Sequence, residues 1–134
     1  MSVYLDEAKR LRAITDVHYN CAQSVLLAFA SEYDLPEKEL YDLSVHFGAG
    51  MKMGGTCGAL TGALMALGLL GIDSVPDANA IEKKVREAHG GMLECRDLLR
   101  VNAEKGGEKK PHCDAMVYEC VGYVEQMLEE KRKA

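Results

Sequence analysis

Four of the five cysteines fall where the sequence predicts the first turn of a helix: Cys21, Cys57, Cys95 and Cys113. Cys21 follows Asn20 and Cys57 follows Thr56, and Asn and Thr both favour the N-cap position. A helix N-terminus carries partial positive charge and unpaired N–H donors, which stabilise a thiolate and lower its pKa. The chemistry to expect is therefore that of activated thiolates, acting either as redox nucleophiles or as metal ligands.

Thiol–disulfide exchange is the first hypothesis, and the protein would then be a thiol–disulfide oxidoreductase. A thiolate would attack an oxidised redox partner protein or a small disulfide, and a second thiol would resolve the mixed disulfide. The sequence contains no C-x-x-C, so the two thiols must meet through the fold. Three pairings are open. We favour Cys21 with Cys57, and Cys113 as a resolving thiol for Cys95, with a protonated His112 assisting Cys113.

A metal site is the second hypothesis, with Cys21, Cys57, Cys95 and Cys113 as ligands. Four cysteines suit zinc or an iron–sulfur cluster, and His18 or His112 could add a ligand. The long gaps between the cysteines lack the close pair from which zinc fingers and bacterial ferredoxins are built. The sequence also leaves open the interpretation that the site holds no cofactor.

A helical interaction module with buried cysteines is the third hypothesis, because free cysteine is among the most buried residue types. Cys120 best fits this description. It lies seven residues after Cys113 on the same face of the last expected helix, about 10 Å away along the axis. That separation is too great for a disulfide between the two, so Cys120 is predicted to be a core residue.

Helical periodicity runs through the whole chain and must position these thiols. It predicts an all-α fold, a compact bundle of six or seven helices around a buried central helix at about 57–70. The apolar face of the last helix carries β-branched residues, but its spacing is helical. The expected helices span about 3–14, 20–33, 36–47, 57–70, 76–89, 95–103 and 113–131.

A glycine-rich loop at 48–55 precedes the central helix. It fits neither the phosphate-binding P-loop nor the dinucleotide fingerprint, because Thr56 and Cys57 follow Gly55 and Met53 stands where a glycine is needed. We expect it to bring backbone close to Cys57 and leave room for a small substrate or a partner's sulfur. The glycines expected at a binding site are Gly54, Gly55, Gly58 and Gly62.

The order of these motifs resembles the C-GCAxxG-C-C family of redox-active proteins. The resemblance rests on CGALTG at 57–62, NCAQ at 20–23, CRDLL at 95–99 and Cys113, and it covers about residues 10–125. It implies that Cys21, Cys57, Cys95 and Cys113 are the defining cysteines of the family and that they serve a redox or cluster role. Cys120 lies outside the pattern.

Composition places the chain in a broad class. A length of 134 residues and a hydrophobic fraction of 48% predict one globular domain, residues 1–134, that folds without disulfide staples. The net charge of -5 argues against nucleic acid as a partner. No signal-peptide or membrane-insertion pattern is present, so we expect a cytoplasmic protein. The smooth face of Gly58, Gly62 and Ala66, or the amphipathic first helix, could serve a homodimer, although such faces more often serve internal packing.

Overall fold

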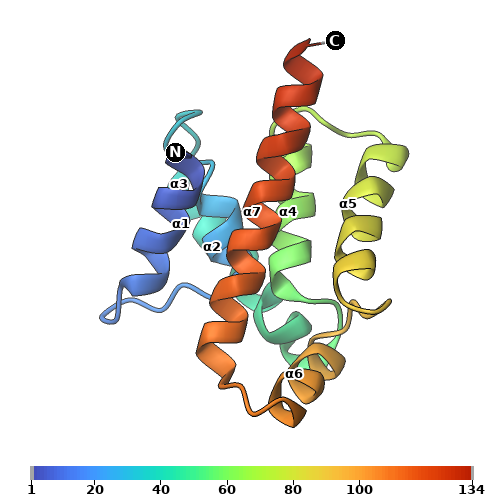
Figure 1. The fold of residues 1–134 in the computed structure, drawn as a ribbon. Helices are drawn as coiled ribbons and strands as arrows, with labels where there is room; N and C mark the ends of the chain where they lie inside the picture. Colours follow the sequence, from blue (N-terminus) through green and yellow to red (C-terminus); the bar gives the residue numbers. More distant parts are fainter. Residues whose placement is uncertain (1, 134) are drawn as a thin grey trace.

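Seven α-helices form the described part of the molecule, residues 2–133 of a computed structural model (Figure 1). Within those residues the only β structure is an isolated antiparallel bridge between Thr56 and Glu94. The predicted all-α fold is confirmed. The helices are α1 (Val3–Ala13), α2 (Cys21–Leu27), α3 (Glu37–Ser44), α4 (Gly58–Leu69), α5 (Val75–Ala88), α6 (Cys95–Glu104) and α7 (Lys109–Lys133).

The central position of α4 is also confirmed. This helix packs against α2, α5 and α7, and α7 crosses in front of it in Figure 1. Ala59, Leu60 and Ala63 of α4 are fully buried. The predicted inner face of α7 meets them with five core residues: Val117, Cys120, Val121, Val124 and Leu128. Burial of these apolar side chains is what holds the bundle together.

Two glycines of α4 allow α2 to pack unusually close. A Cβ added to Gly62 would lie 2.6 Å from the carbonyl oxygen of Ala22, and one added to Gly58 would lie 3.2 Å from the Cβ of Cys21. A larger residue at Gly62 would require α2 to move, whereas one at Gly58 would press on the Phe47 carbonyl oxygen as well as on Cys21. Gly62 and Ala66 are buried inside the bundle, so this stripe serves internal packing instead of offering a surface to a second copy.

The second and third helices differ from the prediction. α2 ends at Leu27, not near Tyr33, because the next N–H groups bond to carbonyls three residues back and tighten the chain into turns. In α3 the inner face carries Leu40 and Ser44, four residues apart, and the Ser44 hydroxyl donates to the Leu40 carbonyl. That face turns Leu43 outward, 65% exposed, and α3 ends at Ser44, before the expected end at residue 47.

The last helix begins one turn earlier than predicted, at Lys109 and not at Cys113. Pro111 falls in its first turn, where backbone N–H groups have no partner within the helix, so the proline breaks no hydrogen bond. The loop expected at 104–111 is correspondingly shorter. Cys113 is therefore the fifth residue of α7, and the predicted first-turn position is wrong for this cysteine.

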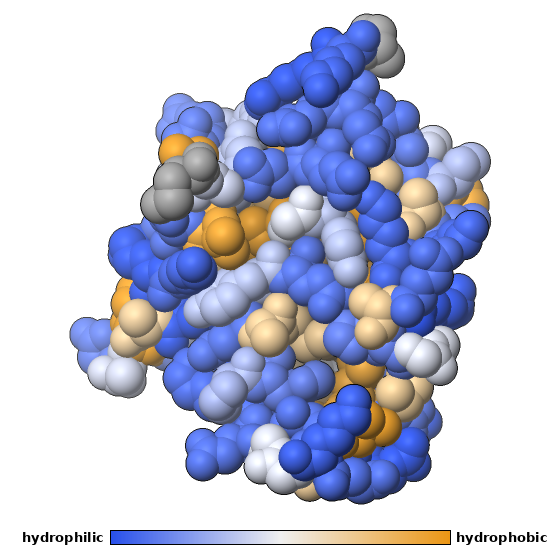
Figure 2. Space-filling model, viewed as in Figure 1, coloured by the Kyte–Doolittle hydropathy of each residue, from blue (hydrophilic) through white to orange (hydrophobic). Residues whose placement is uncertain are grey.

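The face shown in Figure 2 is largely hydrophilic, with smaller hydrophobic areas between the helices. Charged side chains are enriched toward the outer helix faces, as in α5, where only Ile81 and Val85 are fully buried. In the part of the chain that the structure describes, no helix is both long and apolar enough to cross a membrane.

Candidate functional site

A cavity of about 380 Å³ brings together the starts of α2, α4 and α6 and the first part of α7. Its wall contains Cys21, Cys57, Cys95 and Cys113. These four cysteines come from four different helices and are separated by long stretches of chain. Cys120 is absent from the wall; it is fully buried in the core, and this burial raises its pKa well above the ordinary thiol value. The sequence-based separation of Cys120 from the other four therefore holds.

Cys21 is placed by a capping box at the start of α2. The Asn20 side chain accepts a hydrogen bond from the Gln23 N–H, and the Gln23 side chain accepts one from the Asn20 N–H. Asn20 also donates to the carbonyl of Val45, which ties the helix start to the segment after α3. The expected N-cap role of Asn20 is confirmed, and the capping box makes Cys21 the first residue of the helix.

Cys57 and Cys95 are held side by side by the bridge between Thr56 and Glu94. The Cys57 N–H donates to the Leu93 carbonyl at 2.8 Å, and the Cys95 N–H donates to the Gly55 carbonyl at 2.6 Å. The glycine segment and the start of α6 are thereby fixed to each other. Two residues form this bridge, too few for the alternating pattern that reveals a strand in a sequence.

At Cys57, the effect of burial on the thiol pKa outweighs the effect of the helix N-terminus. This residue is the N-cap of α4, and although its side chain forms no capping hydrogen bond, the nearby backbone N–H groups of Ala59 and Leu60 act to lower its pKa, as expected at a helix start. Even so, burial raises the pKa of Cys57 to about 11. Burial also raises the pKa of Cys95. The expectation that a helix N-terminus activates each thiol is therefore wrong for these two, because desolvation disfavours the charged form more than the helix end favours it.

Cys113 is the activated thiol of the set. The Cys21 thiol donates a hydrogen bond to the Cys113 sulfur, which together with the positive charges of Arg12 and Lys109 lowers the pKa of Cys113 to about 7. The same hydrogen bond, reinforced by burial, raises the pKa of Cys21. The thiols that influence each other most strongly are thus Cys21 and Cys113, in place of the expected Cys21–Cys57 pair. None of the five cysteines is joined in a disulfide in this structure.

Arg12 is a functional residue that sequence reasoning missed. Its guanidinium side chain is only 9% exposed, donates to Asp114 at 2.6 Å and to the Tyr19 carbonyl at 2.9 Å, and lies in the cavity wall. In the sequence it is one of several cations on an amphipathic helix, and no local signal separates it from Arg10. The contact of α1 with α7 places it there.

His112 was expected to assist Cys113 as a protonated imidazole, and this is wrong. Burial lowers the pKa of His112, and the nearby His89 lowers it further, so the ring is neutral at pH 7. His112 does line the cavity, as does His18. The charge that stabilises the Cys113 thiolate comes from Arg12 and Lys109 instead.

The glycine loop shapes one side of the cavity through left-handed backbone. Ala49, Gly50, Met51 and Lys52 have φ between 53° and 62°, which is costly for the three residues that carry a side chain. Gly50 is required, because a Cβ there would lie 2.9 Å from the Cβ of Cys95. This arrangement places Ala49 and Lys52 in the wall.

The four glycines expected at a binding site separate into two groups. Gly58 lines the cavity. Gly62 lies deeper, against α2, while Gly54 lies against Arg96 and Gly55 against Gly50. These three determine how α2, α4 and α6 approach one another. They therefore shape the site without forming its wall.

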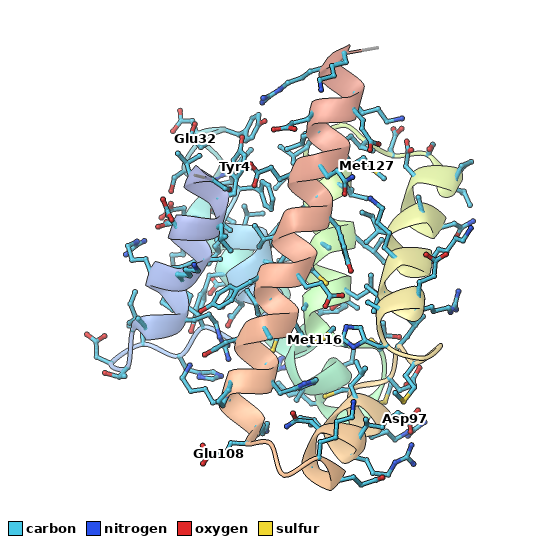
Figure 3. All side chains as sticks on the ribbon, in the orientation of Figure 1. Tyr4, Glu32, Asp97, Glu108, Met116 and Met127 are labelled. Atoms are coloured by element: carbon cyan, nitrogen blue, oxygen red, sulfur yellow. The ribbon has the colours of Figure 1, made fainter. Side chains whose placement is uncertain are left out.

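Leucine and methionine side chains form the apolar part of the wall: Leu98, Leu99 and Met116. Met116 lies in the lower half of α7 in Figure 3, at the end of the molecule where α6 is found. Leu98 and Met116 are buried and join the main hydrophobic core. The cavity thus opens from the core toward the polar starts of the helices.

The metal hypothesis finds little support in this geometry. Across residues 2–133, no group of three or more cysteine, histidine or carboxylate side chains is close enough to hold a metal ion. Zinc and iron–sulfur clusters need such a group of convergent ligands. The four cysteines surround a space that is open to a small molecule, without converging on a point.

Comparison with known proteins gives one match. A family model described as "Putative redox-active protein (C_GCAxxG_C_C)" matches residues 19–127. No curated protein and no solved structure matches the chain. The matched range begins just before Cys21 and includes the whole cavity wall except Arg12 and His18.

Proposed function

Since the chain belongs to the C-GCAxxG-C-C family of redox-active proteins, we propose that it performs thiol–disulfide exchange with Cys113 as nucleophile and Cys21 as resolving thiol. The observation that carries the proposal is the placement of Cys21 and Cys113 together in the wall of a cavity lined by four cysteines, where the two thiols act on each other's pKa. A pKa of about 7 for Cys113 makes half of this thiol a thiolate near neutral pH. Such a thiol is close to the optimum for attack on a disulfide.

The exchange takes place in two steps that conserve atoms and electrons. The Cys113 thiolate attacks one sulfur of a disulfide substrate, forming a mixed disulfide and releasing the other sulfur as a thiolate. Cys21 then gives its proton to solvent or to the departing thiolate and attacks the Cys113 sulfur. A Cys21–Cys113 disulfide forms, and the second substrate thiol leaves. Two protein thiols are oxidised while one disulfide is reduced to two thiols, and an external dithiol reverses the process.

Cys57 and Cys95 have a supporting role in this proposal. Their pKa values are raised, so both are protonated at neutral pH and react slowly. They keep the cavity wall apolar and polarisable next to the reacting pair. The raised pKa values support an order of reactivity in which Cys113 reacts first.

Mapping of disulfides after mild oxidation tests the proposal. The reduced protein is treated with one equivalent of a small disulfide, blocked with an alkylating agent and digested for mass spectrometry. We expect a Cys21–Cys113 bridge, and in a Cys21→Ser variant a stable mixed disulfide on Cys113. Cys57→Ser and Cys95→Ser are the matched controls and retain the bridge. A bridge between any other two cysteines, or equally slow thiols without a bridge, would contradict the proposal.

A further inference from the structure

We propose that the disulfide substrate is a small anion, a low-molecular-weight disulfide that carries carboxylates and enters the cavity whole. This inference rests on the proposed function and names its substrate class. Three independent properties of the cavity lead to it: the sign of its charge, its size and the apolar character of one wall.

The charge of the cavity is opposite to that of the protein. The chain carries 21 acidic and 16 Lys and Arg residues, yet the wall contains Arg12, Lys52 and Lys109 and no aspartate or glutamate. Neither lysine forms an ion pair with any residue in the 2–133 range. Two lysines without a carboxylate partner, beside a space with walls of low polarity, attract an anion and focus its approach.

The two lysines reach the cavity from different elements. Lys52 lies on the left-handed glycine loop, and Lys109 is the first residue of α7. Arg12 comes from α1 and is held by Asp114, so its charge is partly balanced. The lysines therefore provide the free positive charge, and Arg12 acts mainly on the reacting sulfur. A ligand with two carboxylates could meet Lys52 and Lys109 at the same time.

The size and the apolar wall favour a small molecule over a disulfide within a folded protein. A volume of about 380 Å³ is at the lower end of the range of small-molecule pockets. Cys21 and Cys113 are both only partly exposed, which limits access for a bulky partner. Leu98, Leu99 and Met116 offer contact to methylene and sulfur atoms of a small disulfide. Its charged ends would remain near the lysines.

The reaction with this substrate conserves atoms and electrons in the same way as the exchange described above. Cys113 attacks the small disulfide, the first anionic thiol departs, and Cys21 displaces the second. The protein gains one disulfide, and the substrate disulfide gains two electrons and two protons to become two thiols. The substrate itself is the oxidant, so no further co-reactant is needed.

Three small disulfides of similar size and different charge test the inference: dithiodipropionate, a dianion; hydroxyethyl disulfide, which is neutral; and cystamine, a dication. The rate of modification of Cys113 is measured with each by rapid quenching and mass spectrometry. Each rate is divided by the rate of the same disulfide with free mercaptoethanol, which removes differences in intrinsic reactivity. We expect the dianion to be favoured over the neutral disulfide by about tenfold or more at low salt, and the dication to be slowest.

Lysine variants test whether the preference for the dianion arises from the charge of the cavity. Lys52→Gln and Lys109→Gln are each expected to reduce the dianion-to-neutral ratio several-fold. Lys105→Gln, which removes an exposed lysine outside the wall, is the matched control and leaves the ratio unchanged. Lys109 also lowers the pKa of Cys113, so its removal slows all three disulfides, whereas Lys52 does not act on that pKa. The Lys52→Gln ratio is therefore the cleaner measurement.

The outcomes separate this inference from the proposed function. Rapid exchange with all three disulfides, a Cys21–Cys113 bridge and no preference for the dianion would overturn the anionic substrate and leave the exchange function standing. A preference for the dianion that persists in Lys52→Gln and Lys109→Gln would also overturn it, because the charge would then act from elsewhere. Absence of exchange with any of the three would overturn the proposed function together with the inference.

Discussion

Cys113 is distinguished from the other thiols by its lowered pKa, since the pKa of each of the other four is raised. Cys21 is more deeply placed and keeps its proton, which it donates to Cys113, while Arg12 and Lys109 add positive charge on the side of Cys113. The backbone N–H groups of Ala59 and Leu60 act to lower the pKa of Cys57 at its helix end, and burial still raises that pKa. At the scale of the residue, the balance between desolvation and nearby charge decides which thiol has the lowest pKa.

The pH dependence of alkylation at Cys113 follows from this balance. Because the pKa is lowered to about 7, the thiol is protonated and slow below that pH, and its rate rises to a plateau above it. In a Cys21→Ala variant the donated hydrogen bond is lost, and we expect the midpoint to move toward about 8.5, the value of a free thiol. Iodoacetamide kinetics followed by peptide mass spectrometry give both midpoints. An unshifted midpoint in Cys21→Ala would show that the hydrogen bond does not set this pKa.

Cys120 provides the contrasting residue. It is fully buried in the core and absent from the cavity wall. We expect Cys120→Ala to lower the free energy of unfolding by about 1–2 kcal/mol, because it leaves a small cavity. Urea denaturation measures this loss. The alkylation rate and pH midpoint of Cys113 should stay as in the unchanged protein, and a shift in either would assign Cys120 to the reactive group.

At the scale of the element, the packing of α2 against α4 brings Cys21 into the site. Gly58 and Gly62 let the two helices approach, and the start of α2 is fixed by its capping box. The third contribution is the bridge between Thr56 and Glu94, which joins the start of α4 to that of α6. Each of these contacts positions one helix start relative to another.

Substitution of a glycine in this contact tests its importance. Gly62→Ala places a methyl group 2.6 Å from the Ala22 carbonyl oxygen, so α2 must shift. We expect a loss of about 1–3 kcal/mol of folding free energy and a rise in the pKa of Cys113, because Cys21 moves away from it. Gly122→Ala in α7 is the matched control. Its added Cβ meets no atom within 4 Å, so we expect a gain of up to about 1 kcal/mol.

Thermal and urea unfolding, together with the alkylation midpoint, report on both variants. Equal stabilities for Gly62→Ala and Gly122→Ala would mean that the two helices can separate without cost. A destabilised Gly62→Ala with an unchanged Cys113 midpoint would mean that the position of α2 does not control the reactive pair.

At the scale of the whole molecule, a Cys21–Cys113 disulfide would connect the start of α2 to the first part of α7. It would close a loop of about 90 residues, which restricts the unfolded chain strongly. We expect oxidation to raise the free energy of unfolding by about 2–4 kcal/mol. Urea unfolding of oxidised and reduced protein measures the difference. Cys57→Ser should retain this gain and Cys113→Ser should lose it; the reverse result would point to another pair.

The local sequence determined the helices and which cysteine would lie in the core apart from the other four. Periodicity predicted the central helix and the inner face of α7, because apolar spacing and burial are linked residue by residue. The capping box at Asn20 and Gln23 was readable for the same reason, since both members lie within one helical turn. The predicted end of α2 and the predicted start of α7 were less accurate. Turns with local backbone hydrogen bonds have residue patterns that resemble those of a helix.

Only the tertiary structure decided which thiols meet and which one is activated. The Cys21–Cys113 contact joins residues far apart in the chain, and so do the bridge at Thr56 and Glu94 and the approach of Arg12 to α7. The pKa of each thiol depends on how deeply it is buried and on charges from other helices, and neither is encoded at neighbouring positions. The four cysteines could be recognised from their spacing, whereas their chemistry follows from the packing of the helices that carry them.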